Sequence, residues 1–416
     1  MKINVVYINA AYFLWLALFP SFFAVFFSAS SGTPGLLIAA IAIIPALLRY
    51  VKFTKIPISW TGVLIAMLVW ILVVIPGVGG VSYSSKAYFS LFIAIFLLFF
   101  IFLAATWFEQ CNSSRFYRLI SMFWMAFFLI GWIGFFLKVK VFGYKTLAAA
   151  VFPFSEPSHF AIVAGPIYVI SFFLAPKKFK LFIVLNIIFQ AMLLKNLSLL
   201  LYTGIIGAIV FQVCVKNVLM PIIFTTVIAI GVIVAFTVNP AYVAYCTNRL
   251  TLSSKSTSLT VLAARQGIYA AKDSLVDTVG IGLGFQMLGT EKPNEITKII
   301  ASITHGIELS RPEGGFVAAK LIAELGVVGV ALVILVFAQM VRSFFWLRQY
   351  WRNSLRRKFD WSGSQLKLVV AHSLIVAFFV EMFIRGIGYF SLGVILFVFS
   401  LLYIKRHSQH VDYDVT

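Results

Sequence analysis

The segment "FSEPSHF", residues 154–160, opens an otherwise apolar stretch of membrane-spanning length. Glu156 can orient a sugar hydroxyl or accept a proton, and Ser158 and His159 are candidates to bind a sugar. A polar helix cap is the simpler interpretation, because Pro157 suits the first position of a helix. The choice between these interpretations depends on where the other polar residues collect.

A second segment, "HGIELSRPEGGF" at residues 305–316, also gathers groups that can do chemistry. His305 and Glu313 are further candidate proton acceptors, and Arg311 can hold a phosphate through its planar guanidinium. Pro312 and Glu313 would also fit the first turn of a helix. That alternative does not account for His305 and Arg311, and the two glycines that follow allow close backbone approach.

Both segments belong to a very apolar chain. It has 416 residues, is 62% hydrophobic and has a mean hydropathy of +1.02. Continuous apolar runs of spanning length recur from end to end, unlike the alternating segments of a β-barrel. The sequence therefore predicts an all-α polytopic membrane protein with a single transmembrane domain over residues 1–416. Its first hydrophobic run is expected to be a retained span, and its three cysteines imply no disulfide or metal cluster.

Hydropathy and the positive-inside rule predict about 12 spanning helices. They are expected near residues 6–28, 35–49, 59–78, 88–107, 118–138, 157–175, 181–197, 198–215, 218–238, 314–341, 366–384 and 387–404. With the N-terminus inside, nearly every inward segment is basic and both termini lie in the cytoplasm. One outward segment, residues 239–313, is far longer than the others and is predicted to be a large periplasmic loop.

The formal net charge is +20, from 33 Lys and Arg against 13 Asp and Glu. Most of the basic residues flank spans on the predicted inner side, so the excess does not indicate nucleic acid as a partner. Others fall on the predicted outer side, against the insertion tendency: Lys138, Lys140, Lys145, Arg249, Arg265, Lys272, Arg311 and Arg385. A phosphate-bearing substrate would account for them, and lipid headgroups or ion pairs within the loop are the alternative.

Within the large loop, residues 257–279 have a helical pattern. Apolar residues recur at helical intervals, at Val261, Leu262, Ile268, Leu275 and Val276. This pattern predicts an amphipathic helix along the membrane surface, with Arg265 and Lys272 on one face. The following "GIGLGF", residues 280–285, is interpreted as a tight turn, because the strand that a dinucleotide-binding loop requires does not precede it.

Three ionisable residues within the predicted spans have structural interpretations. Glu324 is expected to pair with Lys320 and Glu381 with Arg385, each four residues away on its helix. His372 is expected to be a hydrogen-bonded core histidine. Arg385 keeps a second interpretation, because "FIRGIGYF" (383–390) places it at an outer helix end near Tyr389, whose ring suits the face of a sugar.

Taken together, "FSEPSHF", "AARQGIYAAKDSLVDTVGIGLGF", "AELGVVG" and "FIRGIGYF" resemble, in their order and predicted sidedness, the O-antigen and capsule polymerases (Wzy type) and the related O-antigen ligases. The resemblance implies a GT-C-like membrane glycosyltransferase of the bacterial inner membrane, with a periplasmic active site and no nucleotide sugar. Glu156 and Arg265 match family positions. The His-Asn pair of many members is replaced here by Gly315-Phe316, which leaves the general base open and favours polymerase over ligase.

The outward basic residues, taken with the resemblance, suggest a mechanism. Arg265 and Arg311, with Arg249 and Arg385, are expected to bind the diphosphate of an undecaprenyl-diphosphate-linked oligosaccharide, without a metal or other cofactor. A hydroxyl of another lipid-linked repeat unit would attack with inversion, and Glu156, His305 or Glu313 would accept its proton. Ser158, His159 and Tyr389 are expected to bind sugar.

Further expected partners are the lipid bilayer and a chain-length regulator protein. The alternative activities are an O-antigen ligase, which transfers the glycan to lipid A core, and a lipid-linked oligosaccharide flippase or other transporter. A receptor or structural membrane protein would explain the hydropathy but not the outward arginines.

Overall fold

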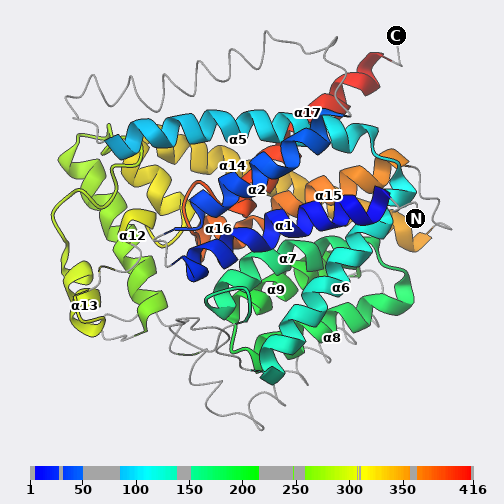
Figure 1. Cartoon of the computed structure of the whole chain (residues 1–416), viewed down its shortest axis with the longest axis horizontal. Helices are drawn as coiled ribbons and strands as arrows, with labels where there is room; N and C mark the ends of the chain where they lie inside the picture. The colour runs from blue at the N-terminus through cyan, green and yellow to red at the C-terminus, as the bar shows by residue number, and fades with distance from the viewer. Residues whose placement is uncertain are drawn as a thin grey trace.

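The computed structural model describes residues 5–27, 31–49, 85–137, 151–214, 247, 258–306, 308, 311–356 and 363–413. Within these ranges the regular secondary structure is helical, which confirms the predicted all-α class (Figure 1). The predicted spans 59–78 and 218–238 lie outside the described residues. So do Arg249 and the three lysines predicted to lie outside before "FSEPSHF".

Among the described residues, six helices are long and apolar enough to cross a membrane, and they confirm a helical membrane protein. They lie at Asn9–Phe26, Ser85–Gln110, Ser113–Phe136, Pro157–Leu174, Val317–Leu355 and Ser364–Phe383. The total of about 12 spans and the GT-C-like arrangement stay predictions.

The helices follow one another in a simple order along the chain. Those before the loop region are α1 (Val5–Phe26), α2 (Thr33–Leu48), α5 (Ser85–Gln110), α6 (Ser113–Leu137), α7 (Pro157–Leu174), α8 (Lys177–Leu193) and α9 (Leu197–Cys214). Those after it are α12 (Leu259–Asp277), α13 (Glu295–Ile303), the 3₁₀ turn η3 (Arg311–Glu313), α14 (Val317–Arg356), α15 (Gly363–Ala377), α16 (Phe379–Phe383) and α17 (Leu392–Tyr413).

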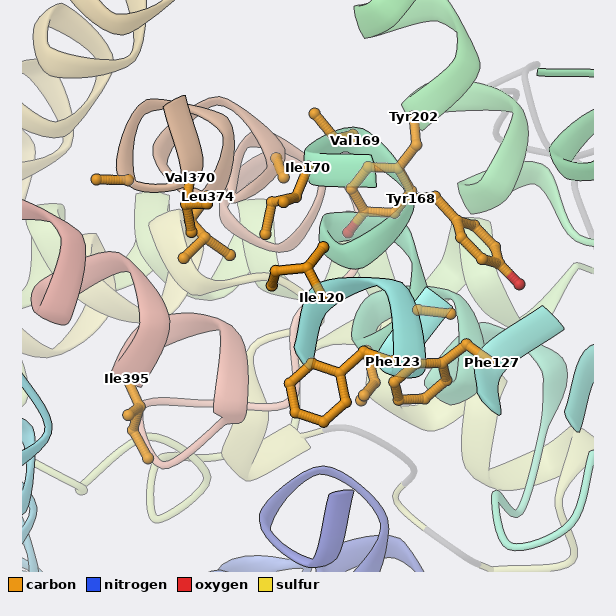
Figure 2. Close-up of a cluster of buried hydrophobic side chains, with 14 of the residues drawn as sticks. Ile120, Phe123, Phe127, Tyr168, Val169, Ile170, Tyr202, Val370, Leu374 and Ile395 are labelled. Atoms are coloured by element: carbon orange, nitrogen blue, oxygen red, sulfur yellow. The ribbon is translucent and has the colours of Figure 1, made fainter. Parts of the chain in front are cut away.

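Helices α7 and α15 form the centre of the bundle. In the apolar stretch of α7, 78% of the residues are buried, and in Ser364–Phe383, which includes most of α15, 83% are buried. The corresponding shares are 11% in α1 and 28% in α6 and α14. Apolar side chains from α6, α7, α15 and α17 meet there, with Tyr202 of α9 beside them (Figure 2). A helix that is apolar on every side is stable only when other helices or lipid surround it. The packing around α7 therefore holds the polar first turn of this helix in a fixed position.

The ends of the spanning helices separate into two groups. At one end, the last turn of α5 meets the N-terminal part of α15 and the C-terminal half of α17: Lys367 Nζ donates to Glu109 O (2.8 Å) and Arg406 pairs with the Glu109 carboxylate (3.3 Å). At the other end, the start of α7 meets the α16–α17 link through the ion pair between Glu156 and Arg385. Segments predicted to lie on the same side of the membrane are therefore together. Figure 1 shows α12 and α13 at the end opposite to the start of α1 and the end of α17.

Helix α14 is broken near the end that carries α12. Gly326 has φ 58° and ψ −132°, which interrupts the helix. The glycine-rich turn after α12 makes backbone hydrogen bonds to both sides of this break. Before it, Leu283 and Gly284 donate to the carbonyls of Ala323 and Glu324 (both 2.9 Å). After it, Val327 donates to Gly280 O (2.8 Å). The backbone groups that the break releases are thus satisfied inside the protein, as hydrocarbon surroundings require. The interpretation of residues 280–285 as a tight turn is confirmed.

Helix α12 is confirmed, and the apolar residues of its pattern divide between two faces. Val261 and Leu262 are buried, while Ile268 and Val276 are exposed. Small residues pack against α14 and the segment before it: Gly267 lies so close to the carbonyl oxygen of Gly314 that an added Cβ would be 2.0 Å from that atom. Such close backbone approach requires a glycine, which hydrophobic periodicity does not predict. The position of α12 along the membrane surface stays a prediction.

We expect Gly326→Ala to lower the free energy of unfolding by about 2 kcal/mol or more, because alanine is strained at this φ and ψ. Its Cβ would also lie 1.9 Å from Gly280 O. Gly204→Ala is the matched control: Gly204 lies in α9 with nothing within 4 Å of an added Cβ. Thermal unfolding in detergent checks both variants, and equal midpoints for the two would contradict the role of the break.

Candidate functional site

The structure joins "FSEPSHF" to "FIRGIGYF" through an ion pair. Arg385 Nη2 lies 2.8 Å from Glu156 Oε1, across 229 residues of sequence. His159 Nε2 lies 3.1 Å from the same oxygen, and its Nδ1 lies 2.9 Å from Ser155 Oγ. The side chains of Glu156 and His159 are 29% and 28% exposed, so solvent still reaches them.

Glu156 is the N-cap residue of α7 and Pro157 begins the helix, as the sequence predicted. The Glu156 side chain makes no capping hydrogen bond to the helix backbone. Its carboxylate is directed to Arg385 instead, so capping does not explain why a glutamate stands here. Asn196, in the α8–α9 turn, fixes this helix start by donating to the carbonyl of Pro157.

A second ion pair lies in the first turns of α14. Lys320 Nζ is 3.3 Å from Glu324 Oε1, and both side chains are buried. Glu324 also accepts hydrogen bonds from the backbone N–H groups of Gln286 (2.9 Å) and Leu288 (3.2 Å). The predicted Lys320–Glu324 pair is confirmed, and it also ties the glycine-rich turn to α14.

Lys320 connects this pair to the rest of the site. Its Nζ donates to Pro312 O (2.5 Å) and lies 5.1 Å from the ring centroid of Tyr389, which stacks on Phe285. Gly386, next to Arg385, donates to Gly315 O (2.9 Å). The η3 turn, the start of α14 and the α16–α17 link are therefore in direct contact.

Glu313, at the end of η3, completes a group that we call the charged cluster. Its members are Lys86, Glu156, His159, Glu313, Lys320, Glu324 and Arg385. Burial raises the pKa of Glu313 above its ordinary value, and Arg385, Lys320 and Lys86 oppose that rise electrostatically. Burial also acts to raise the pKa of Glu156, but Arg385, His159 and hydrogen bonds outweigh it, so that pKa is lowered. Two neighbouring carboxyl groups whose pKa values are shifted in opposite directions are typical of acid–base sites.

Four buried polar atoms of predicted ligand-binding residues have no hydrogen-bond partner in the described part of the chain. One is Arg311 Nε in the loop region, and the other three, Ser158 Oγ, Arg385 Nε and the Tyr389 hydroxyl, belong to the charged cluster or lie beside it. Ser158 lies close enough to Glu156 to help lower its pKa, yet not in good hydrogen-bond geometry. Buried polar groups are normally paired, so these donors fit a site that binds a polar ligand.

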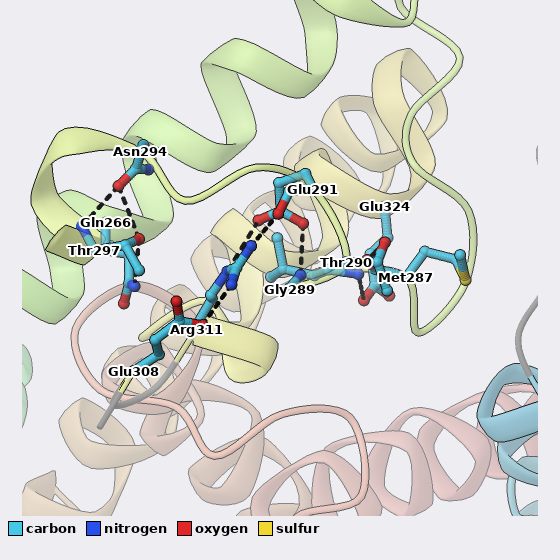
Figure 3. Close-up of polar contacts among 11 residues, drawn as sticks. Gln266, Met287, Gly289, Thr290, Glu291, Asn294, Thr297, Glu308, Arg311 and Glu324 are labelled. Carbon is cyan, nitrogen blue, oxygen red and sulfur yellow. Dashed lines mark hydrogen bonds and ion pairs between the residues drawn. The ribbon is translucent and has the colours of Figure 1, made fainter. Parts of the chain in front are cut away.

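Arg311 is held within the loop region itself. It pairs with the carboxylate of Glu308, donates to the carbonyl of Glu291 and lies 4.0 Å from the Glu291 carboxylate (Figure 3). Glu291 in turn accepts from the N–H of Gly289 (2.6 Å). A diphosphate bound by Arg311 would have to compete with two carboxylates, so its visible role is to connect two loop segments.

Arg265 lies on α12 and His305 lies in the turn after α13. The Arg265 guanidinium is 5.9 Å from the ring centroid of Tyr269, on the exposed face of α12 that also carries Lys272, as predicted. His305 is exposed in the turn after α13, with φ 55°. The structure thus unites Glu156, Glu313 and Arg385 of the predicted site residues, with Ser158, His159 and Tyr389 beside them.

Two sequence interpretations of nearby residues need correction. Glu381 does not pair with Arg385, because α16 ends at Phe383 and the chain turns before a second helical turn can form. Pro312 and Glu313 lie in the separate turn η3 rather than in the first turn of α14, so capping α14 does not occupy the Glu313 carboxylate. His372 is confirmed as a core histidine: its Nδ1 lies 3.0 Å from Ser343 Oγ.

Sequence reasoning missed two cations of the cluster. Lys86 ends the predicted outward segment before α5, so the same sidedness argument that selected Arg385 would have found it. Lys320 was interpreted only through its spacing from Glu324. Its contacts with Pro312 and Tyr389 come from tertiary packing and leave no local signal.

Comparison of the chain with protein-family models, with curated proteins and with solved structures found no match.

Replacing Glu156 with glutamine should lower the free energy of unfolding near neutral pH by about 1 to 3 kcal/mol, because a mostly buried guanidinium loses its charged partner. The folded-state pKa of Glu156 lies below 4.5, so this contribution is fully present above about pH 4.5 and is lost as the pH falls through the folded pKa.

Thermal unfolding midpoints of wild type and Glu156→Gln should therefore differ near neutral pH and converge in acid. The control is Glu295→Gln, an exposed carboxylate in the first turn of α13. A difference that stays constant with pH would contradict the ion-pair account.

Proposed function

We propose that this chain is a membrane glycan polymerase of the GT-C class. It transfers a glycan from an undecaprenyl-diphosphate-linked donor to a hydroxyl of another lipid-linked repeat unit, with inversion and without a metal. The observation that supports this most directly is the charged cluster. It unites segments that the sequence predicts to be outward, and it retains unpaired buried donors at Arg385, Ser158 and Tyr389.

In this proposal Arg385 binds the diphosphate, and Lys86 and Lys320 add positive charge close to it. The leaving diphosphate gains negative charge as the glycosidic bond to phosphate breaks, and fixed cations in a site with little water stabilise that charge strongly. Arg265, Arg311 and Arg249 are proposed as further diphosphate contacts from the large loop. Ser158, His159 and Tyr389 bind the sugar, with the Tyr389 ring against its face.

The location of the charges favours transfer over transport. A transporter for a charged lipid-linked glycan needs polar groups along a path through the membrane. Between α1, α5, α6, α7, α15 and α17 the described residues enclose a hollow lined by apolar side chains. The ligase alternative shares the donor and the same cations, and differs only in the acceptor.

In a reconstituted assay with a defined carrier-linked repeat unit, we expect Arg385→Gln to reduce chain extension by about 10² to 10³ fold, since one preorganised cation is removed. Arg406→Gln is the control, because it also disrupts an ion pair between helices (3.3 Å) but at the other end of the bundle. Arg265→Ala, compared with Lys272→Ala on the same helix face, tests the loop contribution.

A polymer ladder of wild-type length from Arg385→Gln would contradict the proposed role of Arg385. Transport of the intact substrate across proteoliposomes without extension would favour the transporter. Transfer to lipid A core in place of a second repeat unit would favour the ligase.

The proposed localisation is the bacterial inner membrane, with the active site periplasmic and both termini cytoplasmic. In variants with a single cysteine, His305→Cys should react with a membrane-impermeant maleimide in spheroplasts. Cys111, at the other end of the bundle, should react only after permeabilisation. The reverse pattern would place the charged cluster in the cytoplasm and overturn the proposal.

A further inference from the structure

Three residues were candidates for the proton acceptor, and their surroundings differ. His305 is exposed in the turn after α13, and Glu156 is bound by Arg385 and His159. We infer that Glu313 is the general base that removes the proton from the acceptor hydroxyl. This inference rests on the proposed function and adds the identity of one catalytic residue.

The first support is the state of the three carboxylates in the charged cluster. Glu156 lies 2.8 Å from Arg385, and Glu324 is bound by Lys320 and two backbone N–H groups. Within the described residues, Glu313 has no ion pair or side-chain hydrogen bond of this kind. A carboxylate paired with a cation is a weaker proton acceptor than one without such a partner, so Glu313 is the member best able to bind a proton.

The second support is the rigidity of the turn that carries Glu313. Pro312 precedes it, and Lys320 Nζ binds the Pro312 carbonyl at 2.5 Å. Gly314 and Gly315 follow with φ of 69° and 71°, and both pack so closely on α12 and its neighbours that a Cβ would clash. A base acts efficiently only when it is held within hydrogen-bond reach of the proton, and this turn is fixed on both sides.

The third support is the set of charges that face Glu313 from every element packed around it. They are Arg385 from the α16–α17 link, Lys320 from α14, Lys86 from α5 and Glu156 from the segment before α7. Burial and Glu156 raise the pKa of Glu313, while the three cations act to lower it. This balance suits a base that must take up a proton and then release it.

The step balances without any other reactant. The acceptor hydroxyl oxygen forms a bond to the anomeric carbon while its proton passes to the Glu313 carboxylate. The bond from that carbon to the phosphate oxygen breaks, and its electron pair leaves with the undecaprenyl diphosphate. Glu313 then gives the proton to water, which restores the carboxylate for the next addition.

The test uses the full-length protein in the chain-extension assay. Glu313→Gln should lower kcat by about 10² to 10⁴ fold with little change in KM, because a base acts in the transition state. In Glu313→Ala, added formate should restore part of kcat, which it would not do if Glu313 only supported the fold. Glu295→Gln serves as the matched control and should keep wild-type kcat.

The pH profile gives a second readout that does not need a Glu313 variant to fold. Activity of wild type should fall in acid as Glu313 is protonated, with a limb above the ordinary value of 4.5. Lys86→Gln removes a cation that lowers this pKa, so the limb should move to higher pH. Lys298→Gln, exposed on α13, should leave it in place.

Failure of the proposed function and failure of the role of Glu313 give different results. If wild type forms no polymer, the proposed function is wrong. If wild type forms polymer while Glu313→Gln keeps full kcat, or while Lys86→Gln leaves the acid limb unmoved, Glu313 is not the base and the proposed function stands.

Discussion

The constraint on which this structure depends is that a helix in hydrocarbon must satisfy every polar group from within the protein. Charged side chains in such a chain are costly unless they are paired or reach water. Here they gather at the two ends of the bundle, and ion pairs join helices at both. Glu109 collects Lys367 and Arg406 at one end. At the other end the charged cluster joins the starts of α7 and α14 to the α16–α17 link.

The same constraint explains the break in α14. A helix interrupted at Gly326 exposes carbonyls and N–H groups that lipid cannot satisfy, and the glycine-rich turn provides their partners. The break gives the turn a fixed attachment, and the buried Glu324 carboxylate then accepts two more N–H groups from the same segment. The glycine-rich segment after α12 is thereby attached rigidly to the spanning helix α14, and η3, which carries Glu313, is fixed beside it.

Much of this fold follows from local sequence signals. Hydropathy predicted stretches that overlap the six described helices of spanning length, and basic flanks predicted which of their ends lie together. Both signals are local, because they depend on individual segments meeting membrane or water. Pairings between segments were beyond such reasoning: Glu156 and Arg385 are 229 residues apart, and only packing brings them together. The error at Glu381 arose from assuming that a helix continues to Arg385. The close contact between Gly267 of α12 and Gly314 was also not predictable, because it leaves no hydrophobic pattern in the sequence.

The balance of charge in the cluster has a consequence for how a diphosphate would enter. Each cation of the charged cluster already faces a carboxylate, so the cluster is nearly neutral without a ligand. Arg385 is suited to this arrangement because its guanidinium offers five N–H donors in one plane. Its Nη2 donates to Glu156, while Nε, on the same side of the guanidinium, is buried without a partner in the described residues. In the proposed function, this N–H would donate to a phosphate oxygen while Glu156 still holds the guanidinium in place. Ligand binding would then add interactions to the ion pair instead of replacing it, and the orientation of Arg385 would be set before the substrate binds.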